Sequence, residues 1–166
     1  MNTLAHGLWG AALTPKQNKS WIIQAVIFSM LPDLIWLPFM VIYLIYTKNP
    51  IPHSWADAPL WFFQIYSLAH SLVTWLVVFV LSSLILKKIQ WVQVFWLLHI
   101  LIDIPGHIHF TTAFLYPIST YQYHGHFSWE TNPVLILSFL IPTVIIPVRY
   151  IKKKQSEKKI KEKNVP

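Results

Sequence analysis

The sequence predicts an all-α integral membrane protein, a helical bundle of about four spanning helices plus a short N-terminal half-membrane helix. Hydrophobic residues make up 55% of the 166 residues and charged residues only 11%, whereas a soluble domain carries about 25% charged residues. The apolar residues also form long blocks at 21–46, 66–86, 89–105 and 132–151 instead of alternating patterns. Each block is about long enough to cross a hydrocarbon layer of roughly 30 Å at 1.5 Å per residue.

The two ends of the chain differ from these blocks. Residues 2–13, "NTLAHGLWGAAL", are apolar but too short to span, and we expect a half-membrane or re-entrant helix, because irregular backbone is not tolerated in lipid. This segment does not resemble a signal peptide, since it lacks a basic start and contains a histidine. We expect a membrane-embedded domain over 1–151 and a basic, solvated, poorly ordered tail over 152–166.

The basic residues predict an orientation and no nucleic-acid partner. Seven of the 13 Lys and Arg residues are lysines of the tail, and five of the others lie at expected helix ends: Lys16, Lys19, Lys87, Lys88 and Arg149. The excess of positive charge on cytoplasmic segments of membrane proteins explains this distribution. We therefore expect segments 15–20 and 87–88 and the C-terminus in the cytoplasm, with loops 47–65 and 106–131 outside.

Five ionisable residues lie within or beside the apolar segments: His6, Asp33, His70, His99 and Asp103. Counting along helices from the cytoplasmic ends places all five at similar depth, roughly 15 to 25 Å into the bundle. A charged carboxylate at the bilayer centre costs at least ~2.5 kcal/mol. Any one of these residues could serve only to hydrogen-bond a neighbouring helix, but five at one depth predict a functional site.

The stretch "HILIDIPGHIHF" at 99–110 has metal-ligand spacing. His99 and Asp103 are four residues apart and so share one helix face, about 6 Å apart along the axis. The Pro-Gly pair that follows ends the helix, and His107 and His109 come after that break. Imidazole and carboxylate groups placed in this way can bind one metal ion or a bridged pair.

The expected cofactor is Zn²⁺, with more than one ion, and Mn²⁺ or Fe²⁺ as alternatives. The chain has no cysteine, so nitrogen and oxygen ligands remain, and these suit all three metals. Neutral imidazoles and carboxylates around a divalent cation cancel charge that would otherwise be buried unpaired. Asp33 and Asp103 are the candidate catalytic residues, because either carboxylate could bridge metal ions or orient a nucleophile.

Four further residues have weaker patterns. In the outer loop "YHGHFSWE" at 123–130, His126 and Glu130 are four apart, and ligand and bystander remain open alternatives. Together with His109 they are candidates for additional metal ligands. Ser71 follows His70 directly and is a candidate substrate contact, with a helix-packing hydroxyl as the alternative.

Five motifs occur in a recognisable order: "LAHGLWGAAL", "LPDL", "LAHSL", "HILIDIPGH" and "FLYPIS". Over residues 1 to about 135 the chain resembles bacterial membrane-bound metal-dependent hydrolases. That family was long described as a domain of unknown function and includes DNA-damage-regulated inner-membrane proteins. The resemblance implies a place in the bacterial inner membrane and the metal ligands His6, Asp33, His70, His99, Asp103 and, from the "DIPGH" branch, His107.

The same order of ligands is similar to that of zinc-dependent phospholipase C and the related single-strand nucleases. Those enzymes are soluble helical bundles that hold a zinc cluster and cleave phosphodiesters. They supply a later His-x-x-x-Glu pair, which His126 and Glu130 match. The spacing differs here, and we expect the sequence to lack the mature N-terminal amine that those enzymes use as a ligand.

The resulting expectation is a metal-dependent hydrolase that cleaves a phosphoester in a lipid or lipid-linked substrate through metal-activated water. A site at this depth meets acyl chains and headgroups before it meets soluble metabolites. The main alternative is a protein that moves metal ions or protons along the His/Asp cluster, with a dimer supplying the remaining helices. A third possibility is a polar cluster that only specifies helix packing.

Overall fold

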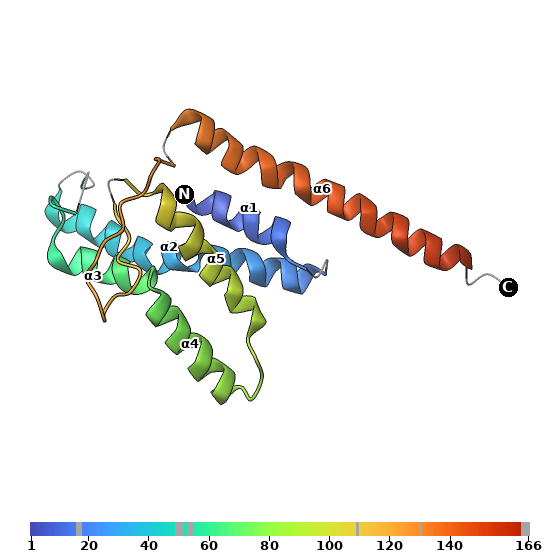
Figure 1. The fold of residues 1–166 in the computed structure, drawn as a ribbon, viewed down its shortest axis with the longest axis horizontal. Helices are drawn as coiled ribbons and strands as arrows, with labels where there is room; N and C mark the ends of the chain where they lie inside the picture. The colour runs from blue at the N-terminus through green and yellow to red at the C-terminus, as the bar shows by residue number, and fades with distance from the viewer. Residues whose placement is uncertain (16–17, 49–51, 53–54, 109, 130, 164–166) are drawn as a thin grey trace.

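The computed structural model describes residues 1–15, 18–48, 52, 55–108, 110–129 and 131–163. These residues form helices and loops, and their only β pairing is an isolated bridge between Thr112 and Tyr123 (Figure 1). The helices are α1 (Thr3–Leu13), α2 (Lys19–Thr47), α3 (Leu60–Ala69), α4 (Leu72–Ile85), α5 (Val94–Asp103) and α6 (Asn132–Lys163). Two short 3₁₀ turns, η1 (Trp91–Gln93) and η2 (Ile104–Gly106), flank α5.

The lengths of the helices agree with the predicted helical membrane bundle. In the described part of the chain, α2 and α6 are each long and apolar enough to cross a membrane, and α3 with α4 forms a pair bent by 51° that could be a third span. The block predicted at 89–105 folds as a shorter apolar helix, over Trp91–Gly106 including its 3₁₀ turns. The structure thus contains two or three candidate spans, where the sequence predicts about four.

The bend between α3 and α4 is built from hydrogen bonds to a distant loop. Ser71 caps α4, because its hydroxyl accepts hydrogen bonds from the backbone N–H groups of Val73 and Thr74. The same hydroxyl donates to the Tyr116 carbonyl, and the Leu72 N–H donates to the Phe114 carbonyl. The loop that contains Phe114 and Tyr116 therefore satisfies backbone groups that a broken helix leaves open in an apolar environment.

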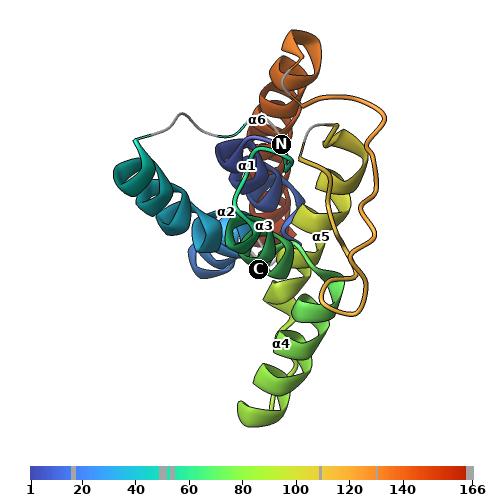
Figure 2. The same ribbon diagram turned by 90° about the vertical axis from the view of Figure 1, so that its left-hand side faces the viewer.

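Helix α1 lies at the centre of the bundle, between α2 and α6 and close to α5 (Figures 1 and 2). Gly10 allows α1 to approach α2 closely, because a Cβ atom at Gly10 would lie 2.6 Å from the Ala25 carbonyl oxygen. Gly7 faces the flexible side chain of Met30 instead, with a Cβ to Sδ distance of 2.8 Å. Small residues at such contacts are typical of packed membrane helices.

We predict that Gly10→Ala destabilises the protein far more than Gly7→Ala does. The new methyl group at residue 10 would collide with backbone, which cannot move aside, and overpacking of this kind costs about 1 to 3 kcal/mol. At residue 7 the Met30 thioether can adopt another rotamer. Thermal unfolding of both variants in detergent tests this, and equal melting temperatures would contradict it.

The C-terminal tail corrects one prediction. The segment from 152, predicted to be poorly ordered, continues α6 as far as Lys163. Lysine, glutamate and glutamine favour helix, and ion pairs Lys153–Glu157 (3.7 Å) and Lys158–Glu162 (3.8 Å) are spaced four residues apart along it. Such pairs add helix stability even when they are exposed.

Helix α6 is fastened to α1 by one basic side chain. The Arg149 guanidinium donates hydrogen bonds to the carbonyl oxygens of Ala12 and Thr14 at the C-terminal end of α1. Helix C-termini carry unpaired carbonyl groups and a partial negative charge, so a cation is favourable there. This contact fixes α6 against the centre of the bundle near the middle of the helix.

Candidate metal centre

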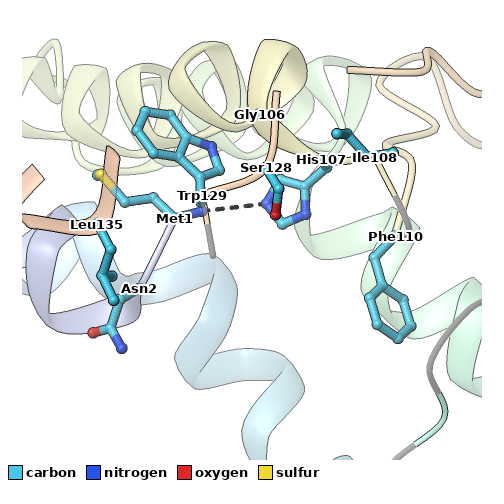
Figure 3. A pocket seen from close by; sticks show the side chains of 9 residues that line it. All are labelled: Met1, Asn2, Gly106, His107, Ile108, Phe110, Ser128, Trp129 and Leu135. Carbon is cyan, nitrogen blue, oxygen red and sulfur yellow. Dashed lines mark hydrogen bonds between the residues drawn. The ribbon is translucent and has the colours of Figure 1, made fainter. Parts of the chain in front are cut away.

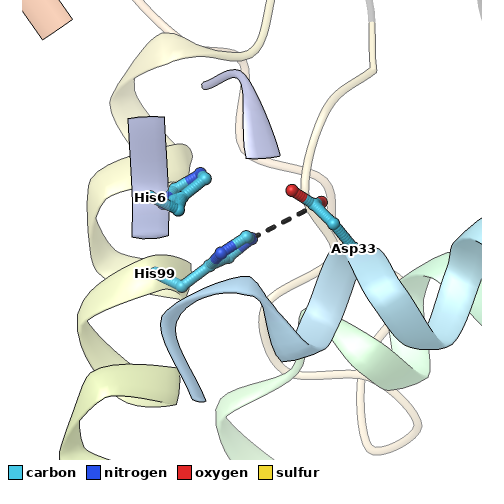
Figure 4. A group of neighbouring side chains, drawn as sticks. All are labelled: His6, Asp33 and His99. Carbon is cyan, nitrogen blue, oxygen red and sulfur yellow. Dashed lines mark ion pairs between the residues drawn. The ribbon is translucent and has the colours of Figure 1, made fainter. Parts of the chain in front are cut away.

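Histidine and aspartate side chains from several helices converge on one point inside the bundle. Figure 4 shows three of them, from α1, α2 and α5, with their polar ends directed toward one another. The full cluster, called here the His/Asp cluster, consists of His6 on α1, Asp33 on α2, His70 at the α3–α4 bend, His99 and Asp103 on α5, and His107 directly after η2. These are the six residues that the sequence nominates as metal ligands, and the structure brings them together.

Asp103 occupies the centre of this cluster and is buried. Its Oδ1 lies 3.0 Å from His6 Nε2. Its Oδ2 lies 3.3 Å from His99 Nε2 and 3.2 Å from His107 Nε2. One carboxylate thus contacts three imidazoles that come from separate parts of the chain.

Asp33 lies on the opposite side, next to His70 and His99. Its Oδ1 is 3.4 Å from His70 Nε2 and 3.7 Å from His99 Nε2. Those two Nε2 atoms are 3.2 Å apart. Among the described residues, the buried Oδ2 of Asp33 has no hydrogen-bond partner. A carboxylate oxygen left unpaired in the interior needs a partner, because its desolvation is costly.

Hydrogen bonds of the Nδ1 atoms fix the position of one ring hydrogen in His70 and in His99. His99 Nδ1 lies 2.6 Å from the Ser29 carbonyl oxygen, and His70 Nδ1 lies 3.0 Å from the Tyr66 carbonyl oxygen. A carbonyl oxygen can only accept, so each Nδ1 carries the hydrogen. In its neutral form, each ring then presents the lone pair of Nε2 to the cluster. Metal-binding histidines in proteins are usually held in this way by a second hydrogen bond.

Local backbone structure makes both carbonyl partners accessible. The Ser29 carbonyl lies in the turn of α2 that precedes Pro32, where the missing proline N–H weakens the helix's own hydrogen bonds. The Tyr66 carbonyl lies in the last turn of α3, just before the bend at His70. The Tyr66 carbonyl also accepts the backbone N–H of His70 at 3.0 Å, so one oxygen holds both the backbone and the ring of that residue.

With neutral rings, acceptor atoms of the histidines face acceptor atoms of the carboxylates. The Nε2 lone pairs of His70 and His99 face each other and also face the carboxylates of Asp33 and Asp103. Two groups offer ligand atoms within 4.8 Å of one another, namely His6 with Asp33 and His99, and His70 with His99 and Asp103. Imidazole nitrogens and carboxylate oxygens in such groups fit a divalent cation. The donor set therefore fits the metal that the sequence predicts.

The terminal amine of Met1 lies next to the cluster. Its nitrogen donates to Asp103 Oδ1 at 2.6 Å and lies 3.3 Å from His107 Nε2 (Figure 3). The Asn2 side chain caps α1 by accepting from the Leu4 N–H at 2.9 Å, and this fixes the chain entering the helix. Of the Asp103 contacts described here, the one with this amine is the shortest.

The loop candidates are placed differently. His126 is exposed and its Nε2 lies 2.6 Å from the Tyr123 hydroxyl, so the structure does not bring it to the cluster. Backbone pairing explains its direction, since the His126 N–H donates to the Pro105 carbonyl at 2.8 Å. His109 and Glu130 lie outside the described residues. Ser71 is buried beside His70, but its hydroxyl is used in the cap and in the bond to Tyr116.

A pocket of about 340 Å³ opens beside the cluster (Figure 3). His107 of the cluster lines the pocket together with Met1, whose amine contacts Asp103, and with Ser128 and Trp129. This volume lies in the range of ligand pockets, roughly 300 to 1,000 Å³. A molecule bound in the pocket would therefore contact the edge of the cluster directly.

We predict that Gly125→Ala weakens metal binding about tenfold, as loss of a supporting contact around a metal site does. The Gly125 N–H donates to the His107 carbonyl at 3.0 Å, and a Cβ atom there would lie 2.7 Å from both the Pro105 carbonyl oxygen and the His107 nitrogen. The collision would displace His107. Competition with a chelator measures the affinity, and His124→Ala, at an exposed neighbouring position, is the control. Unchanged affinity in a folded Gly125→Ala protein would contradict the prediction.

No protein-family model, curated protein or solved structure matches the chain. The cluster is therefore interpreted from its own residues and their geometry.

Proposed function

We propose that the protein is a membrane-embedded metal-dependent hydrolase that cleaves a phosphoester in a lipid or lipid-linked substrate. One observation supports this above the others: lone pairs of His70 and His99 and two carboxylates face one another inside the bundle. A divalent cation relieves that arrangement without leaving a buried charge unpaired. A packing role alone would be served by hydrogen-bond donors facing acceptors.

The two overlapping groups of ligand atoms support more than one ion, with Zn²⁺ first and Mn²⁺ or Fe²⁺ as alternatives. Such ions, when bound, acidify water and stabilise charge on a phosphoryl oxygen. Asp103 holds His6, His99 and His107 in position through its two oxygens. The unpaired Oδ2 of Asp33 can accept a proton from a water nucleophile.

Position within the membrane supports the substrate class. The cluster lies between α2, a candidate span, and the bent pair of α3 and α4, and the adjacent pocket opens beside the first turns of α6. We infer that α5 with its 3₁₀ turns is a fourth crossing element. The lysine-rich end of α6 supports a cytoplasmic C-terminus in a bacterial inner membrane, because positive segments stay on that side.

Elemental analysis by mass spectrometry, combined with a hydrolysis assay, tests the proposal. The detergent-purified protein is expected to hold at least one zinc, manganese or iron atom per chain and to cleave bis(4-nitrophenyl) phosphate or a phospholipid. The variant His99→Ala should lose the metal and the activity, while His124→Ala, at an exposed position in the loop, should keep both.

Two outcomes would contradict the proposal. A wild-type protein that stays metal-free after reconstitution with all three metals has no metal-dependent activity. Metal uptake into proteoliposomes without hydrolysis of any phosphoester would instead favour the alternative function, translocation of metal ions or protons along the His/Asp cluster.

A further inference from the structure

A second cavity lies on the other side of Trp129. It is an apolar groove of about 480 Å³ between α1, α5 and α6. Its walls include Trp9 from α1, Ile102 from α5, and Val134 and Ile141 from α6. This groove is called here the chain groove.

The chain groove and the pocket beside the His/Asp cluster are neighbours. Trp129 lines both cavities, and the first turns of α6 also line both, with Leu135 in the pocket and Val134 in the groove. The pocket is the more polar of the two, since it contains His107, Ser128 and the Met1 amine. The polar pocket beside the His/Asp cluster therefore adjoins the apolar chain groove, and the Trp129 indole lies between them.

The packing of α6 leaves this groove open. Helix α6 packs mainly along α1, and Arg149 fastens it to the end of α1. The groove-lining residues of α6 repeat with helical spacing at Val134, Leu137, Ser138 and Ile141, and so form one face. From Val134 to Ile141 the face extends about 10 Å along the helix. It is apolar apart from Ser138, whose hydroxyl donates to the Leu135 carbonyl of its own helix.

We propose that the chain groove holds a hydrocarbon chain of the substrate while the phosphoester of the same molecule lies in the pocket beside His107. The substrate is then an amphipathic lipid phosphoester, and Trp129 separates its polar and apolar parts. This assignment rests on the proposed phosphoester chemistry at the metal centre. A purely apolar occupant would leave the adjoining polar pocket unused, and a small soluble phosphoester would leave the groove unused.

Photo-crosslinking tests the occupant without requiring turnover. The full-length protein in lipid nanodiscs is exposed to a hexadecyl methyl phosphate that carries a diazirine at the end of its chain, or to hexadecanol with the same label. The phosphodiester probe is expected to label peptides of α1, α5 and α6 about tenfold more than the alcohol. Equal labelling by the two probes would mean that bulk lipid fills the groove, and would overturn the proposal.

Two tryptophan substitutions on α6 make the test specific. Ile141→Trp fills the chain groove, whereas Leu140→Trp places the same side chain on the adjacent face, which lies outside the groove. The first should reduce labelling by the phosphodiester probe about tenfold and the second should not. Should Ile141→Trp fail to fold, Trp9→Ala, which removes part of the groove wall, replaces it with the same expected loss. Equal labelling of the Ile141→Trp and Leu140→Trp proteins would contradict the proposal.

Hydrolysis separates this proposal from the function on which it rests. The substrates are 4-nitrophenyl hexadecyl phosphate and 4-nitrophenyl ethyl phosphate, which share one leaving group and differ in chain length. Ile141→Trp should lower the ratio of kcat/KM for the long ester over the short one about tenfold. An unchanged ratio would overturn the assignment of the chain groove to the substrate chain. If the metal-loaded wild type cleaves neither ester, the proposed hydrolase function is overturned. In that case headgroup-dependent labelling would still support a lipid phosphoester in the groove.

Discussion

Replacing Asp103 with asparagine is expected to remove the bound metal and to lower phosphodiester hydrolysis about a hundredfold to a thousandfold, the range for loss of one group that stabilises charge in an active site. Asparagine keeps the size of the side chain and one oxygen. It removes the negative charge and places an amide NH₂ among imidazole nitrogens that face Asp103 at 3.0 to 3.3 Å. Three of the four histidines of the cluster therefore lose contact with a carboxylate.

The matched control for this substitution is Asp57→Asn, because Asp57 is an exposed aspartate in the loop before α3, outside the cluster. Metal content is measured by elemental analysis and activity with bis(4-nitrophenyl) phosphate, after size-exclusion chromatography has shown that each variant is folded. Asp33→Asn provides a second test on the other side of the cluster. Full metal content and activity in Asp103→Asn would contradict the assignment of Asp103 to the metal centre.

Helical rise explains why the sequence can nominate most of the cluster. A helix advances 1.5 Å per residue, so the number of residues between a charged helix end and a histidine gives its depth. His6, His70 and His99, counted in this way, fall at one level, and the structure places them together. Depth alone leaves open which faces meet, and the carbonyl groups of Ser29 and Tyr66 that orient two rings cannot be read from composition.

The features that the sequence does not reveal depend on contacts between distant segments. The block at 66–86 contains no proline or glycine, yet the chain bends at His70 and Ser71, because the partners of the bend lie at Phe114 and Tyr116. Met1 reaches Asp103 across more than a hundred residues. Its only local signal is Asn2, a residue type that favours helix N-caps.

The loop around Gly125 shows the opposite case, a ligand-like pattern in the sequence whose histidine the structure does not bring to the cluster. His126 and Glu130 have the spacing of ligands on one helix face, but that spacing matters only where the segment is helical. In the structure the segment around Gly125 pairs with the backbone of η2 through the Pro105 carbonyl and with the residue after η2 through the His107 carbonyl, and His126 is exposed. A four-residue spacing without an established helix is therefore weak evidence for a ligand pair.

Removing the metal with a chelator is expected to lower the melting temperature of the wild-type protein by about 10 °C. The cluster joins α1, α2, α5 and the α3–α4 bend, so a cation bound only in the folded state stabilises the packing of all four. Free metal at about a thousand times its dissociation constant contributes ~4 kcal/mol. Each kcal/mol shifts the melting temperature of a chain of this size by roughly 2 to 4 °C.

Comparing the wild type with Asp103→Asn distinguishes a cluster that binds metal from one that serves only for helix packing. Zinc should restore the wild-type melting temperature after chelation and should leave that of Asp103→Asn unchanged, because the variant lacks the carboxylate that contacts three imidazoles. A cluster that serves only for helix packing predicts the reverse pattern. In that case the wild type would melt at one temperature with chelator or zinc, and Asp103→Asn would be less stable than the wild type under both conditions, since it breaks buried contacts without any ion to lose.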